Sequence, residues 1–145
     1  MARQASTGFE EVRHTADVAI RVWGTSLEEL FQSAAAGMFA TIGATGKEPA
    51  ISTATGEVEH SINLEAGDLE TLLVDWLNEL LYLSETKKEL YTGFEVQIEP
   101  TWRLQATVRG YVADFTGDKV KAVTYHGLSI EQTGGYYTAV VVFDT

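Results

Sequence analysis

The sequence predicts an α+β fold, a two-layer sandwich in which two helices cover one face of a largely antiparallel sheet. Three observations support this class. Apolar residues alternate at strand spacing through most of the chain, they recur at helical spacing in only two early segments, and short turns join most of the later strands. Hairpin-joined strands pair antiparallel, and a helix that is apolar on one side must bury that side against another element, here the sheet. The predicted element order is βαβαββββ.

The first half of the chain contains a strand, a helix and a second strand. Residues 18–22 alternate at strand spacing. Ser-Leu-Glu-Glu at residues 26–29 matches a helix capping box, and apolar residues then recur at helical spacing as far as Ile42. Gly, Thr and Pro indicate a loop over residues 44–55, after which residues 58–64 alternate again. The last segment is predicted to be a half-buried strand.

The second half opens with a helix and continues as strands. Asp68 is a suitable N-terminal cap for a helix over residues 69–81, which carries a broad apolar stripe. Gly134 and Gly135 predict a tight hairpin between the last two strands. The four predicted strands of this half cover residues 94–98, 102–108, 119–131 and 136–144.

Composition indicates one domain, over residues 9–145, preceded by a disordered tail over residues 1–8. The chain has 145 residues, 45% of them hydrophobic, which is enough for one core. A net charge of −11 argues against direct, strong binding of nucleic acid, because phosphate contacts need clustered Lys and Arg. No segment is apolar enough to span a membrane or act as a signal peptide, so we expect a cytoplasmic protein. The absence of cysteine excludes disulfides, zinc-thiolate sites and thiol nucleophiles.

Two aspartates flanked by apolar residues lie near opposite ends of the chain. Asp17 follows His-Thr-Ala, and Asp144 ends the run Val-Val-Val-Phe-Asp. A fold that brings these ends together needs a cation, a proton or a lysine to offset the repulsion between the carboxylates. Taken from the residues alone, however, Asp17 is a typical turn or capping residue and Asp144 a typical solvated one.

The predicted hairpin allows a count of cross-strand partners. If Thr133 pairs with Tyr136, counting outward places Asp144 opposite Tyr125 and Thr145 opposite Thr124. In this register Asp144 shares a face of the sheet with Tyr125, Val123 and Lys121, because cross-strand partners point the same way. His126 has the opposite parity and does not join them. Lys121 lies roughly 13 Å along the strand from Tyr125, so the register does not imply a bond between Lys121 and Asp144.

Four blocks of sequence, in order and at similar spacing, closely resemble the archease family. The resemblance extends from about Phe9 to the end of the chain. The blocks are His-Thr-Ala-Asp-Val at residues 14–18, Asp-Leu-Glu-Thr-Leu-Leu-Val-Asp-Trp-Leu-Asn-Glu-Leu-Leu at 68–81, Lys-Ala-Val-Thr-Tyr-His-Gly-Leu at 121–128 and Val-Phe-Asp at 142–144.

This resemblance implies an accessory protein and not an enzyme. Its partner would be the GTP-dependent RNA ligase of tRNA splicing. Archease promotes guanylylation of the ligase's active-site histidine, restores multiple turnover and can broaden the nucleotide that the ligase accepts. The implied metal ligands are Asp17, Asp144 and Thr145, and the family's ion is calcium. Magnesium and manganese also suit a site made of oxygen atoms alone.

Further residues have implied or proposed roles. Lys121 matches a lysine that is functional in the family. His14 is a candidate for orienting a ligand, with a structural histidine as the alternative, and Tyr125 and His126 are candidates for a partner surface. Two positions depart from the family pattern. Arg13 stands where several relatives have an acidic residue, and Thr145 replaces an aliphatic one.

Two other classes of function remain open from the sequence. One is a metal-dependent phosphodiesterase or hydrolase that uses Asp17 and Asp144, although no general base, nucleophile elbow or phosphate loop accompanies them. The other is a chaperone-like binding module in which the ion has a structural role. RNA hydrolysis would favour the first, and broad suppression of aggregation would favour the second.

Overall fold

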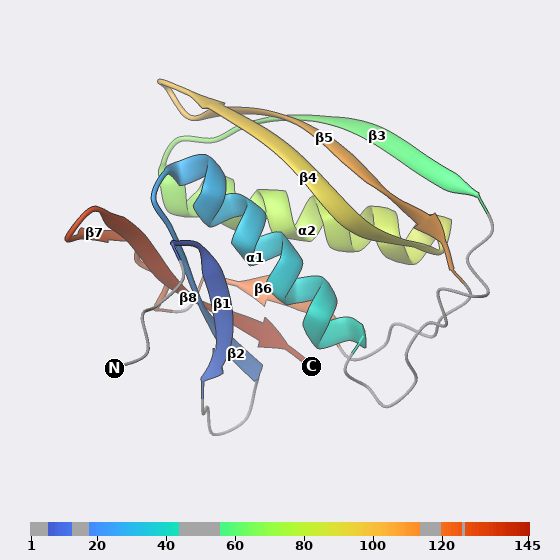
Figure 1. The fold of residues 1–145 in the computed structure, drawn as a ribbon, viewed down its shortest axis with the longest axis horizontal. Coiled ribbons are helices and arrows are strands. Elements are labelled where there is room, and N and C mark those ends of the chain that lie inside the picture. Colours follow the sequence, from blue (N-terminus) through green and yellow to red (C-terminus); the bar gives the residue numbers. More distant parts are fainter. Residues whose placement is uncertain (1–5, 13–17, 44–55, 114–119, 126) are drawn as a thin grey trace.

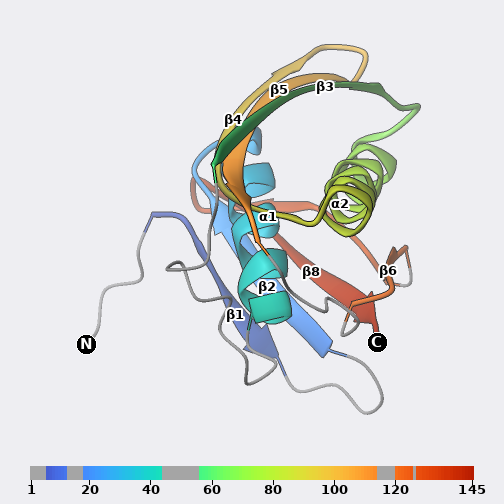
Figure 2. The same cartoon turned by 90° about the vertical axis from the view of Figure 1, so that its right-hand side faces the viewer.

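Two antiparallel sheets enclose two helices in the computed structural model, which describes residues 6–12, 18–43, 56–113, 120–125 and 127–145 (Figures 1 and 2). The first sheet, sheet A, has the order β1-β2-β8-β6, with β7 also paired to β8. Its strands are β1 (Gly8–Val12), β2 (Val18–Gly24), β6 (Ala122–Thr124), β7 (Glu131–Thr133) and β8 (Tyr136–Asp144). The second sheet, sheet B, has the order β3-β5-β4. Its strands are β3 (Glu57–Glu65), β4 (Glu89–Glu99) and β5 (Arg103–Val112).

The helices α1 (Leu27–Gly43) and α2 (Leu69–Lys87) lie between the sheets and contact both of them. The α+β class, the two helices and the antiparallel pairing are therefore confirmed, while the strands form two sheets and not one. The buried side chains of α2 explain this division, because they occupy consecutive positions and cover more than one side of the helix. These residues are Leu72, Leu73, Val74, Trp76, Leu77, Leu80, Leu81 and Ser84.

β1, the first strand of sheet A, is absent from the predicted element order. Gly8, which we assigned to a disordered tail, pairs with Trp23 of β2. A Cβ atom on Gly8 would lie 2.8 Å from the Trp23 indole, so the close approach requires glycine. Thr7 adds a hydrogen bond from its hydroxyl to the Trp23 carbonyl oxygen, at 3.1 Å. The described structure therefore includes residues 6–8, the last three residues of the predicted tail.

The strand predicted over residues 119–131 is two short strands, β6 and β7. Between them the chain leaves the sheet in a turn, in which the Leu128 N–H donates to the Tyr125 carbonyl oxygen at 2.9 Å and Gly127 has a φ of 68°. The hairpin that follows is confirmed, with Thr133 paired to Tyr136. Its two central glycines both have positive φ, as a two-residue turn of this kind requires.

Both helices begin with the predicted caps. The Ser26 hydroxyl accepts from the Glu29 N–H at 3.1 Å, and the Glu29 carboxylate accepts from the N–H and hydroxyl of Thr25. These bonds to Thr25 lower the pKa of Glu29. At α2, the Asp68 carboxylate accepts from the Thr71 N–H at 2.7 Å. Two sequence-local signals thus set where the helices start.

Trp76 connects the two helices in the middle of the core. It is fully buried, and its indole N–H donates to the Phe31 carbonyl oxygen of α1 at 3.0 Å. A buried tryptophan normally needs such a partner for its N–H. The core between the sheets therefore fixes α2 relative to α1, and α2 in turn supports the end of sheet A described next.

Candidate functional site

Sheet A brings the beginning of β2 beside the end of β8. Val18 pairs with Phe143, and the pairing continues as far as Gly24 with Tyr137. Val18 directly follows the His-Thr-Ala-Asp block, and Phe143 directly precedes Asp144. The C-terminus lies at this end of the sheet (Figures 1 and 2). His14, Asp17 and His126 lie outside the described residues, so their places in the site stay predictions.

The register of β6 on β8 differs from the prediction by three residues. Asp144 pairs with Ala122 and not with Tyr125. The reason is the turn between β6 and β7, because the six residues 125–130 stand opposite only three residues of β8, 139–141. An odd shift reverses which face each side chain occupies. Asp144 therefore shares its face with Ala122, whereas Val123 packs in the buried core.

This shift brings Lys121 to Asp144. The Lys121 N–H donates to the Asp144 carbonyl oxygen at 2.7 Å, although the predicted register left the two residues apart. The contact joins main-chain groups, and both side chains are exposed. One exposed group at the end of sheet A consequently contains Asp144, Thr145 and Lys121. The first two are candidate oxygen ligands, and Lys121 is a cation.

Asn78 of α2 holds β6 in this position. The Val123 N–H donates to Asn78 Oδ1 at 3.0 Å, and Asn78 Nδ2 donates to the Val123 carbonyl oxygen at 3.3 Å. The side-chain amide thus makes the pair of bonds that a further strand would make at the edge strand β6. The sequence feature that could have indicated this role is the polar amide of Asn78 among the buried apolar residues of α2.

Tyr125 lies over α2 and not beside Asp144. Its hydroxyl donates to Asp75 Oδ1 at 3.4 Å, and its side chain is 53% exposed. Partial burial raises the pKa of Tyr125, and the negative charges of Asp75 and Asp68 raise it further. Of the predicted residues, the structure therefore brings together Lys121, Asp144 and Thr145, and it places Tyr125 on the neighbouring helix face.

The oxygen atoms at the end of β8 suit a hard cation as part of an open site. Asp144 provides an exposed carboxylate and Thr145 an adjacent main-chain oxygen, both without sulfur or imidazole. The described residues contain no group of three or more His, Cys, Asp or Glu side chains that could hold a metal ion. A complete site would therefore need Asp17, or oxygen atoms from a partner.

A buried cluster of ionisable groups lies under sheet B. Glu89 Oε1 is 2.6 Å from His60 Nε2 and accepts from the Tyr91 hydroxyl at 2.7 Å. Burial raises the pKa of Tyr91, and the bond to Glu89 raises it further. All three residues belong to strands of sheet B, and the cluster is best explained as a set of hydrogen-bond partners for the buried Glu89 carboxylate.

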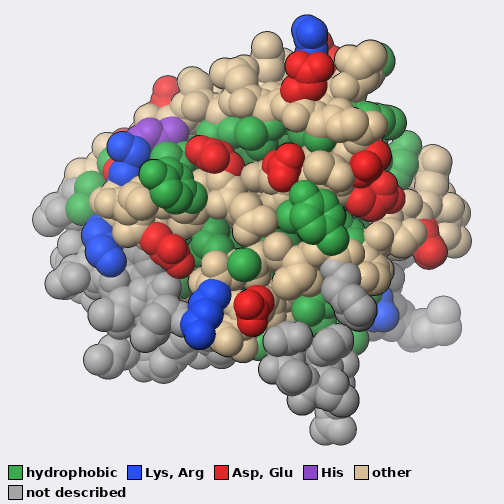
Figure 3. All heavy atoms as spheres, turned by 180° about the vertical axis from the view of Figure 1, so that it is seen from behind, with side chains coloured by type: hydrophobic (Ala, Val, Ile, Leu, Met, Phe, Trp, Pro, Cys, Tyr) green, Lys and Arg blue, Asp and Glu red, His purple; other side chains and the backbone are tan. Residues whose placement is uncertain are grey.

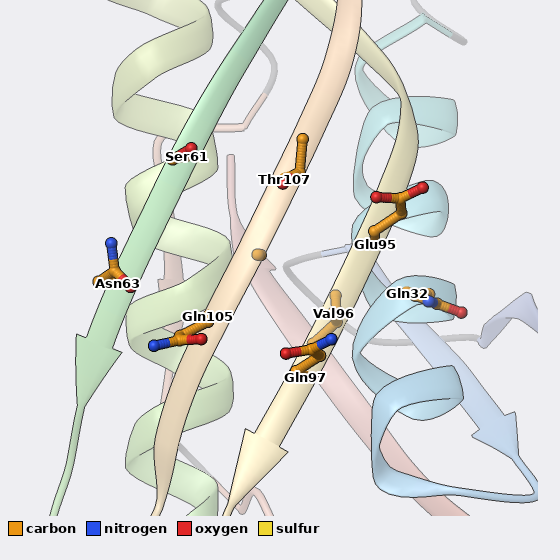
Figure 4. A pocket seen from close by; sticks show the side chains of 9 residues that line it. Gln32, Ser61, Asn63, Glu95, Val96, Gln97, Gln105 and Thr107 are labelled. Carbon is orange, nitrogen blue, oxygen red and sulfur yellow. The ribbon is translucent and has the colours of Figure 1, made fainter.

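The outer face of sheet B carries a shallow hollow lined by uncharged polar side chains (Figure 4). Asn63, Gln105 and Gln97 form one row across the three strands, and Ser61 and Thr107 lie in the next. Glu95 also lines the hollow and pairs with Arg109 at 3.2 Å. Of the predicted site residues that the structure describes, none lines it. Its amides and hydroxyls supply hydrogen bonds and no evident nucleophile or base.

Fold and site together define an α+β protein with two antiparallel sheets around two helices and an exposed acidic end of one sheet. None of the described helices is long and apolar enough to span a membrane. The same fold occurs in the solution structure of Methanobacterium thermoautotrophicum protein 1598, with a TM-score of 0.69, 34% identity and coverage of 95% of this chain and 99% of that one. A crystal structure from Thermotoga maritima, described as an archease and possible chaperone, has a TM-score of 0.63, 28% identity and coverage of 100% and 98%.

The chain belongs to the Archease protein family, whose sequence pattern matches residues 9–145. Protein archease of Methanosarcina mazei is 38% identical over 94% of both chains. Protein archease of Methanopyrus kandleri is 36% identical over 94% of this chain and 98% of its own. The resemblance carried by the four sequence blocks is therefore confirmed.

Proposed function

We propose that this chain activates a GTP-dependent RNA ligase of tRNA splicing by promoting its guanylylation and multiple turnover. Membership of the archease family supports the proposal. The observation that carries it is the pairing of Val18 with Phe143, because this pairing joins the two ends of the chain that bear Asp17 and Asp144 in sequence. In this role the protein assists the ligase and performs no reaction of its own.

Asp17, Asp144 and Thr145 would hold a divalent cation, with calcium as the leading candidate. Bound there, the ion would supply positive charge with free coordination positions for oxygen atoms of the partner. The main-chain bond from Lys121 fixes the backbone of Asp144 at the end of sheet A, and Asn78 keeps β6 in place beside it. The exposed Lys121 side chain adds a cation that can contact a nucleotide phosphate in the ligase.

A turnover assay with the cognate ligase tests this function. Wild-type chain should raise ligation well beyond one product per ligase and speed formation of the ligase–guanylate. Asp144→Ala should lower the stimulation by about tenfold or more, since it removes a charged ligand. Glu99→Gln, which changes an exposed carboxylate on sheet B, is the matched control. Circular dichroism should show that all three chains are folded.

The possible outcomes distinguish a failure of the acidic site from a failure of ligase activation. No stimulation by the wild type would refute ligase activation. Full stimulation by both Asp144→Ala and Asp17→Ala would refute the acidic site while leaving activation in place. The description of the Thermotoga maritima structure as a possible chaperone favours one alternative. Under that alternative the chain would suppress aggregation of unrelated proteins, and Asp144→Ala would do so equally well.

A further inference from the structure

We propose that the exposed side of α2 is the surface on which the partner docks, and that the partner presents a basic, arginine-bearing surface to it. We call this surface the α2 face and define it by Asp68, Asp75, Glu79, Tyr82 and Tyr125. The inference rests on the proposed function and adds to it the place and the chemistry of the contact.

Two exposed aromatic side chains mark the α2 face. Tyr82 is 62% exposed and Tyr125 is 53% exposed, and they are two of the three large hydrophobic side chains that are exposed in the described part of the chain. Tyrosine is enriched at the centres of protein interfaces, because its ring buries a large area and its hydroxyl keeps a hydrogen bond. The cost of leaving these rings in water would be offset by a partner that covers them.

The two tyrosines belong to one continuous surface although they are far apart in sequence. Asp75, Glu79 and Tyr82 lie four and three residues apart on α2 and therefore on one side of the helix. Tyr125 comes from the end of β6 and reaches the same side through its bond to Asp75. Figure 3, which views the molecule from behind, shows acidic side chains spaced around separate apolar ones on this face.

The charges of the α2 face select a basic partner. Within the described residues, each arginine pairs with acidic groups on the two sheets, Arg21 with Glu10, Arg103 with Glu65, and Arg109 with Glu59 and Glu95. No ion pair in the same residues involves Asp68, Asp75 or Glu79. Their negative charge is therefore left for a partner to neutralise, and complementary charge both steers association and sets its specificity.

Arginine is the cation that fits this combination of groups best. A guanidinium group can bond a carboxylate such as Asp75 with two N–H groups while its plane stacks on a tyrosine ring. An enzyme that binds RNA lines its channel with arginine and lysine, because it must neutralise phosphates. The α2 face thus matches such a channel, whereas RNA itself would be repelled by it.

Docking on the α2 face would also place the partner next to the acidic end of sheet A. Asn78, on the same helix, binds Val123 of β6, and the neighbouring residue Ala122 pairs with Asp144. A protein seated on α2 and Tyr125 therefore lies beside Asp144 and Lys121. This continuity explains how one surface can supply affinity while the adjacent site acts on the partner.

The test is a binding titration of the fluorescently labelled full chain with the purified cognate ligase, at low and high salt. Two variants alter the α2 face, Tyr82→Ala with Tyr125→Ala, and Asp75→Lys with Glu79→Lys. The control, Glu57→Lys with Glu99→Lys on sheet B, changes the net charge by the same amount as the second variant. We expect each α2-face variant to weaken binding by about tenfold or more and the control by less than about twofold.

The charge-reversed variant should also lose most of the salt dependence of binding, because it removes the charges that salt screens.

Thermal melting and circular dichroism identify variants that fail to fold, and the tyrosine variant keeps the test valid if the charge reversal is unstable. Wild-type affinity in both folded α2-face variants would overturn the inference, as would equal weakening by the control. If wild-type chain stimulates the ligase and the folded α2-face variants bind it with wild-type affinity, only the inference fails. If wild-type chain neither binds nor stimulates it, the proposed function fails as well.

Discussion

At the scale of single residues, Glu89 shows how the fold accommodates a buried carboxylate. The residue is only 6% exposed, and one of its oxygen atoms contacts both His60 and Tyr91. Its main-chain oxygen accepts a further hydrogen bond from the Ser84 hydroxyl at 2.6 Å. Because Tyr91 and Ser84 are buried and His60 is partly buried, the carboxylate is largely shielded from water and depends on these partners for its hydrogen bonds.

Stability at alkaline pH should depend on Tyr91. Its pKa is raised above the ordinary value of 10.0, so its contribution to stability is complete below that pH and is lost as the pH rises towards the folded-state pKa. Wild-type chain should lose up to about 1.4 kcal/mol of unfolding free energy per pH unit above this value through Tyr91. Urea unfolding at about pH 9 and pH 11 measures the loss.

Tyr91→Phe should be less stable than wild type at neutral pH by about 1 kcal/mol, because Glu89 loses one hydrogen bond. Its further loss at alkaline pH should nevertheless be smaller than that of the wild type. Tyr82→Phe, which alters an exposed ring, is the control. An alkaline loss in Tyr91→Phe as large as in the wild type would show that Tyr91 does not cause it.

At the scale of elements, the contact between α2 and β6 decides the geometry of the candidate site. β6 has only three residues and pairs with β8 on one side. On its other side, Asn78 supplies a donor and an acceptor to Val123. A strand this short would otherwise leave polar main-chain groups unpaired at the edge of the sheet. The position of Lys121 at Asp144 therefore depends on one amide side chain.

Asn78→Ala should loosen β6 without unfolding the protein. The change leaves the Val123 N–H and carbonyl oxygen without their partner, at a cost of about 2 kcal/mol. Hydrogen exchange followed by mass spectrometry should show faster exchange of the Val123 amide, and chemical unfolding gives the change in stability. Asn63→Ala, an exposed amide on sheet B, should change neither quantity. Unchanged exchange at Val123 in Asn78→Ala would contradict the anchoring role.

At the scale of the whole molecule, sheet A closes the chain on itself. β2 pairs with β8 across more than a hundred residues of sequence, and the helices and sheet B are inserted between them. A cation bound between the two ends would therefore tie together the first and last parts of the domain. Such a ligand adds its binding free energy to the stability of the fold, because the unfolded chain has no assembled site.

Calcium should raise the melting temperature of the wild-type chain. At a calcium concentration about one hundred times Kd, the gain in unfolding free energy is about 2.7 kcal/mol. Differential scanning calorimetry with calcium and with a chelator measures the shift, and magnesium and manganese provide the comparison. Asp144→Ala should lose the shift, whereas Glu99→Gln should retain it. Equal melting temperatures of wild type with calcium and with chelator would count against a cation site formed by this chain alone.

Much of the fold and part of the site followed from local patterns. Ser26 and Asp68 identified the starts of the helices, and the two glycines at residues 134 and 135 identified the hairpin. β1 was not predicted, because its five residues and their polar neighbours show little of the apolar–polar alternation that indicates a strand. The position of Tyr125 was not predicted either, because three additional residues in the turn before β7 shift the register of β6 on β8.

The sequence by itself determined the α+β class, the helices, the antiparallel hairpins and the family, since each depends on neighbouring residues or on motifs in order. Only the tertiary structure decided that there are two sheets, that Asp144 lies beside Lys121, and that Asn78 holds β6 against α2. The physical reason is that periodicity constrains which side of an element is buried, whereas the choice of partner depends on the packing of elements that are distant in the chain. The candidate site lies where those distant elements meet.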